Sequence, residues 1–328
     1  MDLPTGKVSP YELKEILFEE LDLEGEEVLV KPEVGADASV IELDDGALVL
    51  SSDPITGSLK DPGRLSVHVN ANDVASMGAD PKWFLLTLFM PEGADRSDIK
   101  EVMEGARKAC EELDISLVGG HTEITPGLER VLISGAMAGM APKDEWTSSS
   151  GAQPGDDIIF TKSAAVEGTF ILSEDKESEL KENYGEEVVN KGKSYGDKLS
   201  VVKEALTAVE NGKVHAMHDP TEGGLIGGLY ELADASEVGF SIYSDKINIS
   251  EETKTICDHF GLDPLRTISS GSLLIITSSD ESEKIVKSIE DHDIEASIIG
   301  EIVKKENRRE IDGEEAEYPE RDELWDVF

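Results

Sequence analysis

The chain has 328 residues, 38% of them hydrophobic, and its 71 Asp and Glu outnumber 30 Lys and Arg, for a net charge of −41. This length allows two domains, each with its own core. The negative charge disfavours nucleic acid and anionic membrane surfaces as partners. Because the acids are spread along the whole chain, we interpret them as the surface of a halophilic protein, where salt screens their repulsion, rather than as a site that gathers metal ions or basic partners.

The two cysteines, Cys110 and Cys257, form no Cys-x-x-Cys pair, which excludes the usual structural zinc site. Both lie in stretches with helical spacing, where a reduced, buried thiol is the simplest interpretation. The first residues lack the apolar segment of a secretory signal, and no apolar run reaches the length of a membrane helix. We therefore expect a soluble, cytoplasmic protein.

Apolar spacing predicts alternating strands and helices throughout the chain. The sequence Leu43-Asp-Asp-Gly46 predicts a hairpin turn, and the continuous apolar run 83–90 predicts a buried strand. Further helical segments are expected between residues 163 and 211. The other predicted strands cover 26–30, 38–43, 47–53, 115–120, 130–140, 157–162, 213–219, 239–243, 272–278 and 296–302, and the predicted helices cover 9–21, 63–77, 95–113, 223–236, 250–260 and 281–291.

Residues 141–157 are rich in Ser, Gly and Pro, which is typical of a domain boundary. We therefore predict two α/β or α+β domains, over residues 1–148 and 149–328. The last residues are charged and weakly patterned, and we expect a partly ordered tail whose Trp325, Val327 and Phe328 are able to dock.

Four loops of the first half place acids or glycines at the ends of predicted elements. Asp37 leads into a strand and Asp53 follows one. In the stretch VHVNANDVASMGADP, Asn70, Asn72 and Asp73 are expected in the first turns of a helix, where Asp73 is either a cap or a carboxylate displayed to a ligand. The fourth loop is VGGHTE, where Gly119 and Gly120 end a strand and His121 and Thr122 follow. Individually these are ordinary turn and cap residues; together they resemble a set that holds Mg²⁺ beside phosphate.

Two stretches of the second half add to this set. Asp219 precedes Pro220, and Gly223 and Gly224 open a predicted helix, whose N-terminus is either an anion site or a point of close packing. Lys162 ends a strand and is either a contact for an anion or a solvated side chain. Three standard motifs are absent from the chain, namely the P-loop, the dinucleotide-binding GxGxxG after the first strand and the nucleophile elbow.

In this order, GADASVI, SSDPI, NDVASMGADP, VGGHTE, TKSAAVEGT, HDPTEGGL and SGSLLI resemble the aminoimidazole ribonucleotide (AIR) synthetase, or PurM-like, family. That family includes thiamine-monophosphate kinase, selenophosphate synthetase and the hydrogenase maturation factor HypE. The matching pieces span Gly35 to Gly271. The resemblance implies an N-terminal domain whose sheet forms a barrel in a homodimer, an α+β C-terminal domain, and ATP with Mg²⁺ in the cleft between the domains.

The resemblance also implies roles for individual residues. Asp37, Asp53 and Asp73 would form the metal site. Asp53, Asp73 and His121 would be catalytic. The nucleotide site would be lined by Asp37, Asn70, Gly119, Gly120, Thr122, Lys162, Asp219, Gly223 and Gly224.

The spacing of the later motifs is most similar to HypE, but three features differ. HypE ends in a Cys that receives a carbamoyl group, whereas this chain ends in DELWDVF. Selenophosphate synthetase has a reactive residue in an N-terminal loop, and no Cys precedes Cys110 here. Kinase members usually have an Asp where this chain has Ala36 and another where it has His121.

We therefore expect an ATP-dependent enzyme that transfers a phosphoryl group to an oxygen of an amide, carboxamide or phosphate acceptor, with a small molecule or a protein tail as that acceptor. Two alternatives remain open. One is a biosynthetic member, AIR synthetase or thiamine-monophosphate kinase. The other is a nucleotide-binding maturation or scaffold protein that has lost catalysis.

Overall fold

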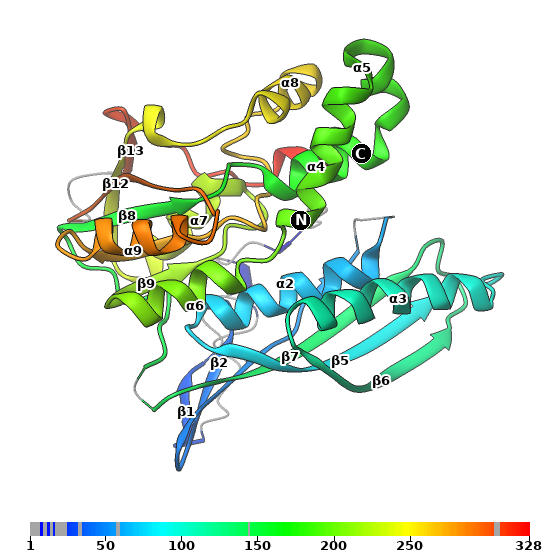
Figure 1. Ribbon diagram of the computed structural model, residues 1–328, viewed down its shortest axis with the longest axis horizontal. Coiled ribbons are helices and arrows are strands. Elements are labelled where there is room, and N and C mark those ends of the chain that lie inside the picture. The colour runs from blue at the N-terminus through cyan, green and yellow to red at the C-terminus, as the bar shows by residue number, and fades with distance from the viewer. Residues whose placement is uncertain are drawn as a thin grey trace.

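The computed structural model describes residues 7–8, 12–13, 16, 25–31, 35–56, 60–143, 145–304 and 309–328. These residues form two halves, each built around a mixed sheet with helices packed against it (Figure 1). The helix predicted over 9–21 lies outside the described residues except for Glu12, Leu13 and Ile16, which are helical. No helix of the described part of the chain is both long and apolar enough to cross a membrane.

The first sheet has seven strands in the order β1-β2-β3-β7-β5-β6, and β4 pairs with β7. Strands β5 and β6 are parallel and the other pairs are antiparallel. Pairing of Leu43 with Gly46 confirms the predicted hairpin. The strands are β1 (Val28–Val30), β2 (Ser39–Leu43), β3 (Gly46–Ser51), β4 (Pro54–Ile55), β5 (Asp80–Met90), β6 (Ser116–Ile124) and β7 (Leu132–Ala141).

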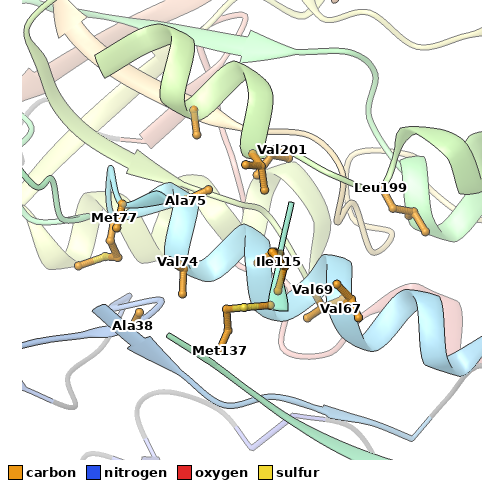
Figure 2. Packing of buried hydrophobic residues seen from close by; sticks show 14 of the residues in the cluster. Ala38, Val67, Val69, Val74, Ala75, Met77, Ile115, Met137, Leu199 and Val201 are labelled. Atoms are coloured by element: carbon orange, nitrogen blue, oxygen red, sulfur yellow. The ribbon is translucent and has the colours of Figure 1, made fainter. Parts of the chain in front are cut away.

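Helices α2 (Pro62–Ser76) and α3 (Arg96–Glu112) cover one face of this sheet (Figure 1). Pro62 suits the first helical position because the missing N–H would have no partner there, and the Asp61 side chain caps the helix by accepting from the Arg64 N–H. Figure 2 shows α2 between the sheet, where Val74 faces Met137, and the second half, which contributes Val201. Because α2 is buried on nearly all sides, its polar residues must find partners inside the protein.

The second sheet also has seven strands, in the order β14-β13-β10-β12-β8-β11-β9. Its strands are β8 (Asp156–Thr161), β9 (Val214–His218), β10 (Val238–Ile242), β11 (Leu274–Ser278), β12 (Ala296–Lys304), β13 (Arg309–Ile311) and β14 (Glu314–Glu315). The helices of this half are α4 (Val166–Asp175), α5 (Glu177–Lys193), α6 (Val202–Asn211), α7 (Gly224–Ala235), α8 (Glu251–Phe260) and α9 (Ser282–Glu290). The loop over residues 142–155 joins the two sheets, and the boundary at residue 148 remains a prediction.

Two predictions about the first sheet are wrong. Strand β5 is not buried on both faces, because Trp83 and Leu85 keep 43% and 47% of their surface exposed. No described helix covers the face to which they belong, so burial alternates along the strand. Strand β6 does not end at its glycines but continues to Ile124 through parallel pairing with β5. A Cβ at Gly120 would lie 1.9 Å from the Leu86 carbonyl oxygen, so this position requires glycine for close approach.

The tail is ordered over residues 309–328 and packs on the second half. Leu324 is buried, Trp325 donates from its indole Nε1 to Glu222 Oε2 at 3.3 Å, and Val327 accepts from Lys176 Nζ at 3.2 Å. Figure 1 places the end of the chain beside α4. These contacts confirm that the tail docks.

Candidate active site

Four carboxylates from four separate segments gather where the two halves meet. Asp37 precedes β2, Asp53 follows β3, Asp73 lies in α2, and Asp219 follows β9. Burial raises the pKa of Asp73 and of Asp219 well above its ordinary value, and the charges of the neighbouring aspartates raise it further. Burial also raises the pKa of Asp53, with Asp37 and Glu222 adding to the shift and Lys7 opposing it. Mutual repulsion in a buried site is a sign that a cation belongs there.

Asp73 is not at the start of its helix, as predicted, but in its last turn. The helix predicted over 63–77 is observed over Pro62–Ser76, so position 73 lies eleven residues after its first residue. A carboxylate at this end is opposed by the helix dipole, whose C-terminus is negative, so Asp73 cannot be a stabilising cap. Its Oδ2 accepts a hydrogen bond from Ser51 Oγ at 2.5 Å. The position is unfavourable for stability and therefore favours a functional role.

Asn70, predicted to contact the nucleotide, instead holds the backbone of Asp53. Its Oδ1 accepts from the Asp53 N–H at 2.9 Å, and its Nδ2 donates to the Ser66 carbonyl at 2.9 Å and to the Asp53 carbonyl at 3.3 Å. A Cβ at Gly135 would lie 2.4 Å from Nδ2, so glycine there makes room for the amide. Asn70 thus fixes the loop that carries the carboxylate.

His218 lies between two carboxylates. Its Nδ1 forms an ion pair with Asp37 Oδ1 at 2.7 Å, and its Nε2 is hydrogen-bonded to Glu231 Oε2 at 2.9 Å. Burial lowers the pKa of His218, but the two acids outweigh burial and raise it well above 6.5. Ser76 Oγ donates to Asp37 Oδ2 at 2.9 Å. Asp37 is therefore held from both sides.

Lys7 brings a cation from the N-terminal segment to this site. Its backbone N–H donates to Glu222 Oε2 at 3.0 Å, and its Nζ lies 4.0 Å from Glu231 Oε1. Glu231 raises the pKa of Lys7, and Asp53, Asp37 and Asp73 raise it further. Burial alone would raise the pKa of Glu231. Lys7 and His218 outweigh burial and lower this pKa to about 2.

The carboxylates fit a magnesium ion that arrives with its own oxygen ligands. No three acidic, His or Cys side chains among the described residues form a ready-made metal cage. Mg²⁺ is commonly held by only one or two carboxylates together with waters and substrate phosphates. One oxygen of Asp219, Oδ2, is buried without a hydrogen-bond partner, and a cation or its bound water would satisfy it.

The two glycines at the start of α7, Gly223 and Gly224, have structural roles. Gly223 has φ +86° and caps the helix, and its N–H donates to Asp322 Oδ2 of the tail at 2.6 Å. A Cβ at Gly224 would lie 2.7 Å from the Thr267 carbonyl oxygen. Close packing thus explains glycine at position 224, and the N–H of Gly223 already binds an internal carboxylate. Their contact with the nucleotide remains a prediction.

Lys162, a predicted nucleotide contact, is engaged elsewhere. Its Nζ lies 2.5 Å from Glu204 Oε1 and donates to the carbonyls of Ser200 at 2.5 Å and Gly271 at 2.8 Å. An ammonium group has three donors, so binding a nucleotide would require one of these contacts to break.

The predicted residues of β6 lie apart from the carboxylates within one chain. Gly119, Gly120, His121 and Thr122 are exposed on this edge strand, and His121 Nε2 lies 3.0 Å from Glu123 Oε2. Between Asp53 and Gly120 lie two strands of the sheet, β7 and β5, so the two residues are three strand spacings apart. Three strand spacings amount to about 14 Å.

Sequence analysis missed the residues that hold the carboxylates in place. They are Lys7, Ser51, Ser76, Glu222 and Glu231. Of these residues, only Glu231 could have been predicted from the sequence. It lies two helical turns after Gly224 and therefore on the same face of α7 as that predicted site residue.

Residues 35–141 match the family described as AIR synthase related protein, N-terminal domain, and residues 153–312 match its C-terminal domain. The chain belongs to this AIR synthase-related family and has its two-domain PurM-like fold.

Within the family the chain is similar to HypE. Carbamoyl dehydratase HypE of Azotobacter vinelandii is 31% identical over 281 residues, which span 83% of this chain and 80% of that protein. A protein of Methanocaldococcus jannaschii named for hydrogenase expression/formation is 29% identical over 92% of this chain and 89% of its own length. The crystal structure of HypE in complex with ATP superimposes with a TM-score of 0.70 at 26% identity, covering 92% of this chain and 88% of that one.

Proposed function

We propose that this chain is an ATP-dependent, HypE-like enzyme that binds ATP with Mg²⁺ at Asp37, Asp53, Asp73 and Asp219. It transfers the γ-phosphoryl group to an oxygen of an amide, carboxamide or phosphate acceptor. The observation that carries the proposal is the convergence of Asp37, Asp53, Asp73 and Asp219 in a buried site, with an unsatisfied oxygen on Asp219. The ATP bound to a related HypE supports the choice of nucleotide.

In this mechanism the aspartates bind the metal ion and the two serines orient aspartates. Asp37, Asp53, Asp73 and Asp219 would hold Mg²⁺, directly or through its bound waters, and the ion when bound would neutralise charge that develops on the phosphoryl oxygens. The hydroxyls of Ser51 and Ser76 orient two of the carboxylates. The bond from the γ-phosphorus to the bridging oxygen breaks, ADP leaves with that electron pair, and the acceptor oxygen bonds to phosphorus. Catalysis rests on positioning and charge, as in other phosphoryl transfers.

A thermal melt in about molar KCl tests the nucleotide site, because salt screens the repulsion of so acidic a chain. ATP and Mg²⁺ together should stabilise the protein by about 2.7 kcal/mol at a hundred times the dissociation constant. ATP alone and Mg²⁺ alone should give smaller shifts, since the carboxylates repel an uncomplexed triphosphate. Absence of any shift with the pair would contradict the proposed function, and a shift without phosphate release on adding acceptors would favour the non-catalytic alternative.

We further propose that the uncovered face of the first sheet is the interface of a homodimer. Trp83 and Leu85 of β5 are exposed on this face, and Val118 is exposed on the neighbouring edge strand β6. Exposed apolar residues of this kind are typical of an interaction surface. A nucleotide shared across this interface would meet Gly119, Gly120, His121 and Thr122, which therefore remain proposed contacts.

Replacing Leu85 with Glu should convert the dimer into a monomer, because the charge would be buried without a partner at the interface. Light scattering on the eluting protein should change from twice 35.5 kDa to 35.5 kDa. Tyr243→Glu is a matched control, since Tyr243 is 47% exposed, as Leu85 is, but belongs to the second half. A wild-type monomer at micromolar concentration would contradict the proposed dimer.

A further inference from the structure

A cavity of about 190 Å³ lies beside the four aspartates and is lined by both halves of the chain. From the first half it has Pro54, which follows Asp53, and Ile55 of β4. Glu222 also lines the cavity, and its charge raises the pKa of Asp53. A molecule in this cavity would therefore sit next to the proposed phosphoryl group.

The tail forms the outer wall of the cavity. Leu324, Trp325 and Phe328 line it, and the segment is held by Asp322, which accepts from the N–H groups of Gly223 and Leu324 at 2.6 and 2.8 Å. These contacts give the cavity a fixed apolar side.

The size of the cavity limits what it accepts. An apolar cavity of about 150 Å³ holds one benzene molecule, whereas pockets for drug-sized ligands measure about 300–1,000 Å³. Ile55, Leu65, Ile171 and Leu324 are buried apolar residues of its lining. The occupant is thus about the size of one ring with a single polar substituent.

The charge of the cavity limits that substituent. Among the described lining residues the acids are Glu167, Asp175 and Glu222, and Arg130, an exposed residue, is the single base. Glu167 is only 5% exposed, and burial raises its pKa to about 7. Ionised carboxylates accept hydrogen bonds but cannot donate them, and they repel anions.

We propose that this cavity is the acceptor site and that it takes a small, ring-sized amide or amidine that is neutral or cationic, while excluding acceptors that carry a phosphate or carboxylate. The N–H groups of the acceptor donate to Glu167 and Glu222, and its apolar body packs against the tail. That the bound molecule accepts a phosphoryl group rests on the proposed function, but its binding to the cavity requires no nucleotide.

Calorimetric titration of the full chain at pH 8 with three probes of equal size tests the proposal. Benzamidinium, benzamide and benzoate carry charges of +1, 0 and −1. We expect benzamidinium and benzamide to bind, and benzoate to bind at least tenfold more weakly. Benzoate binding as tightly as benzamidinium would overturn the proposal, as would absence of binding by both nitrogen-containing probes.

Two variants locate the binding. Glu167→Gln should weaken benzamidinium at least tenfold and leave benzamide nearly unchanged, whereas Glu187→Gln, at a glutamate 83% exposed on α5, should change neither. Thr56→Trp, at an exposed position of the lining, should block all probes without disturbing the core. Unchanged binding in Thr56→Trp would place the probes elsewhere and overturn the proposal. Loss of the ATP–Mg²⁺ melting shift with intact probe binding would instead contradict the proposed function alone.

Discussion

Replacing Asp73 with Asn is expected to reduce ATP turnover by about a hundred- to a thousandfold and, at the same time, to raise the melting temperature of the ligand-free protein. Activity falls because the proposed metal site loses one of its carboxylates. Stability rises because burial and the charges of Asp53 and Asp219 raise the Asp73 pKa well above its ordinary value, and each unit of such a shift costs about 1.4 kcal/mol once the group ionises. Phosphate release and thermal melts measure the two effects.

The pH dependence of the Asp73→Asn effect has a definite sign. The folded-state pKa of Asp73 is raised, so the wild type loses stability as pH rises from the ordinary pKa of 3.8 towards the folded-state value. The Asn variant lacks this loss, and its advantage should vanish as pH falls towards 3.8. Asp258→Asn, at an exposed position of α8, is the control. A variant that is as active as wild type would refute the role of Asp73 in metal binding.

Replacing Glu231 with Gln should destabilise the protein by about 3 kcal/mol at neutral pH. Removing one partner of a buried ionic group leaves the other charge uncompensated, which typically costs about 3–5 kcal/mol. Here the remaining charges are Lys7 and His218. His218 keeps Asp37 as a second partner at 2.7 Å, so the lower end of that range applies. Gln preserves the shape and one hydrogen-bond acceptor, so the change measures the charge. Urea unfolding at several pH values is the measurement.

The destabilisation by Glu231→Gln should be largest between two limits of pH. The Glu231 pKa is lowered to about 2, so its stabilisation is complete above the ordinary value of 4.5 and lost as pH falls towards 2. The His218 pKa is raised, so its stabilisation is complete below 6.5 and lost as pH rises through the higher folded-state value. Glu251→Gln, at a glutamate 89% exposed on α8, should show neither change. A Glu231→Gln effect that is equal at all pH values would contradict the ionic network.

Most elements of the fold follow from the sequence because they depend on local patterns. Asp95, for example, caps α3 as part of a capping box with Asp98, close to the predicted start. Asp37, Asp53 and Asp73, predicted as the metal site, and Asp219, predicted to line the nucleotide site, lie close enough for their charges to interact. Whether they bind a metal remains a prediction.

The errors concern contacts that depend on tertiary structure. Asp73 was placed at the wrong end of its helix because its neighbours Asn70 and Asn72 look like a polar helix start. In the protein these amides instead bind backbone groups of other segments, Asn70 at Asp53 and Asn72 at Leu199. No local pattern states that Lys162 pairs with Glu204, which lies 42 residues later and is buried.

The division of the four aspartates between the halves gives the site a mechanical property. Asp37, Asp53 and Asp73 belong to the first half and Asp219 to the second. Repulsion between their charges therefore pushes the two halves apart. A cation bound as proposed would reverse the sign of this force and draw the two halves together. Its loss with the spent nucleotide would restore the repulsion, so the charge proposed to bind the ligand would also help to release the product.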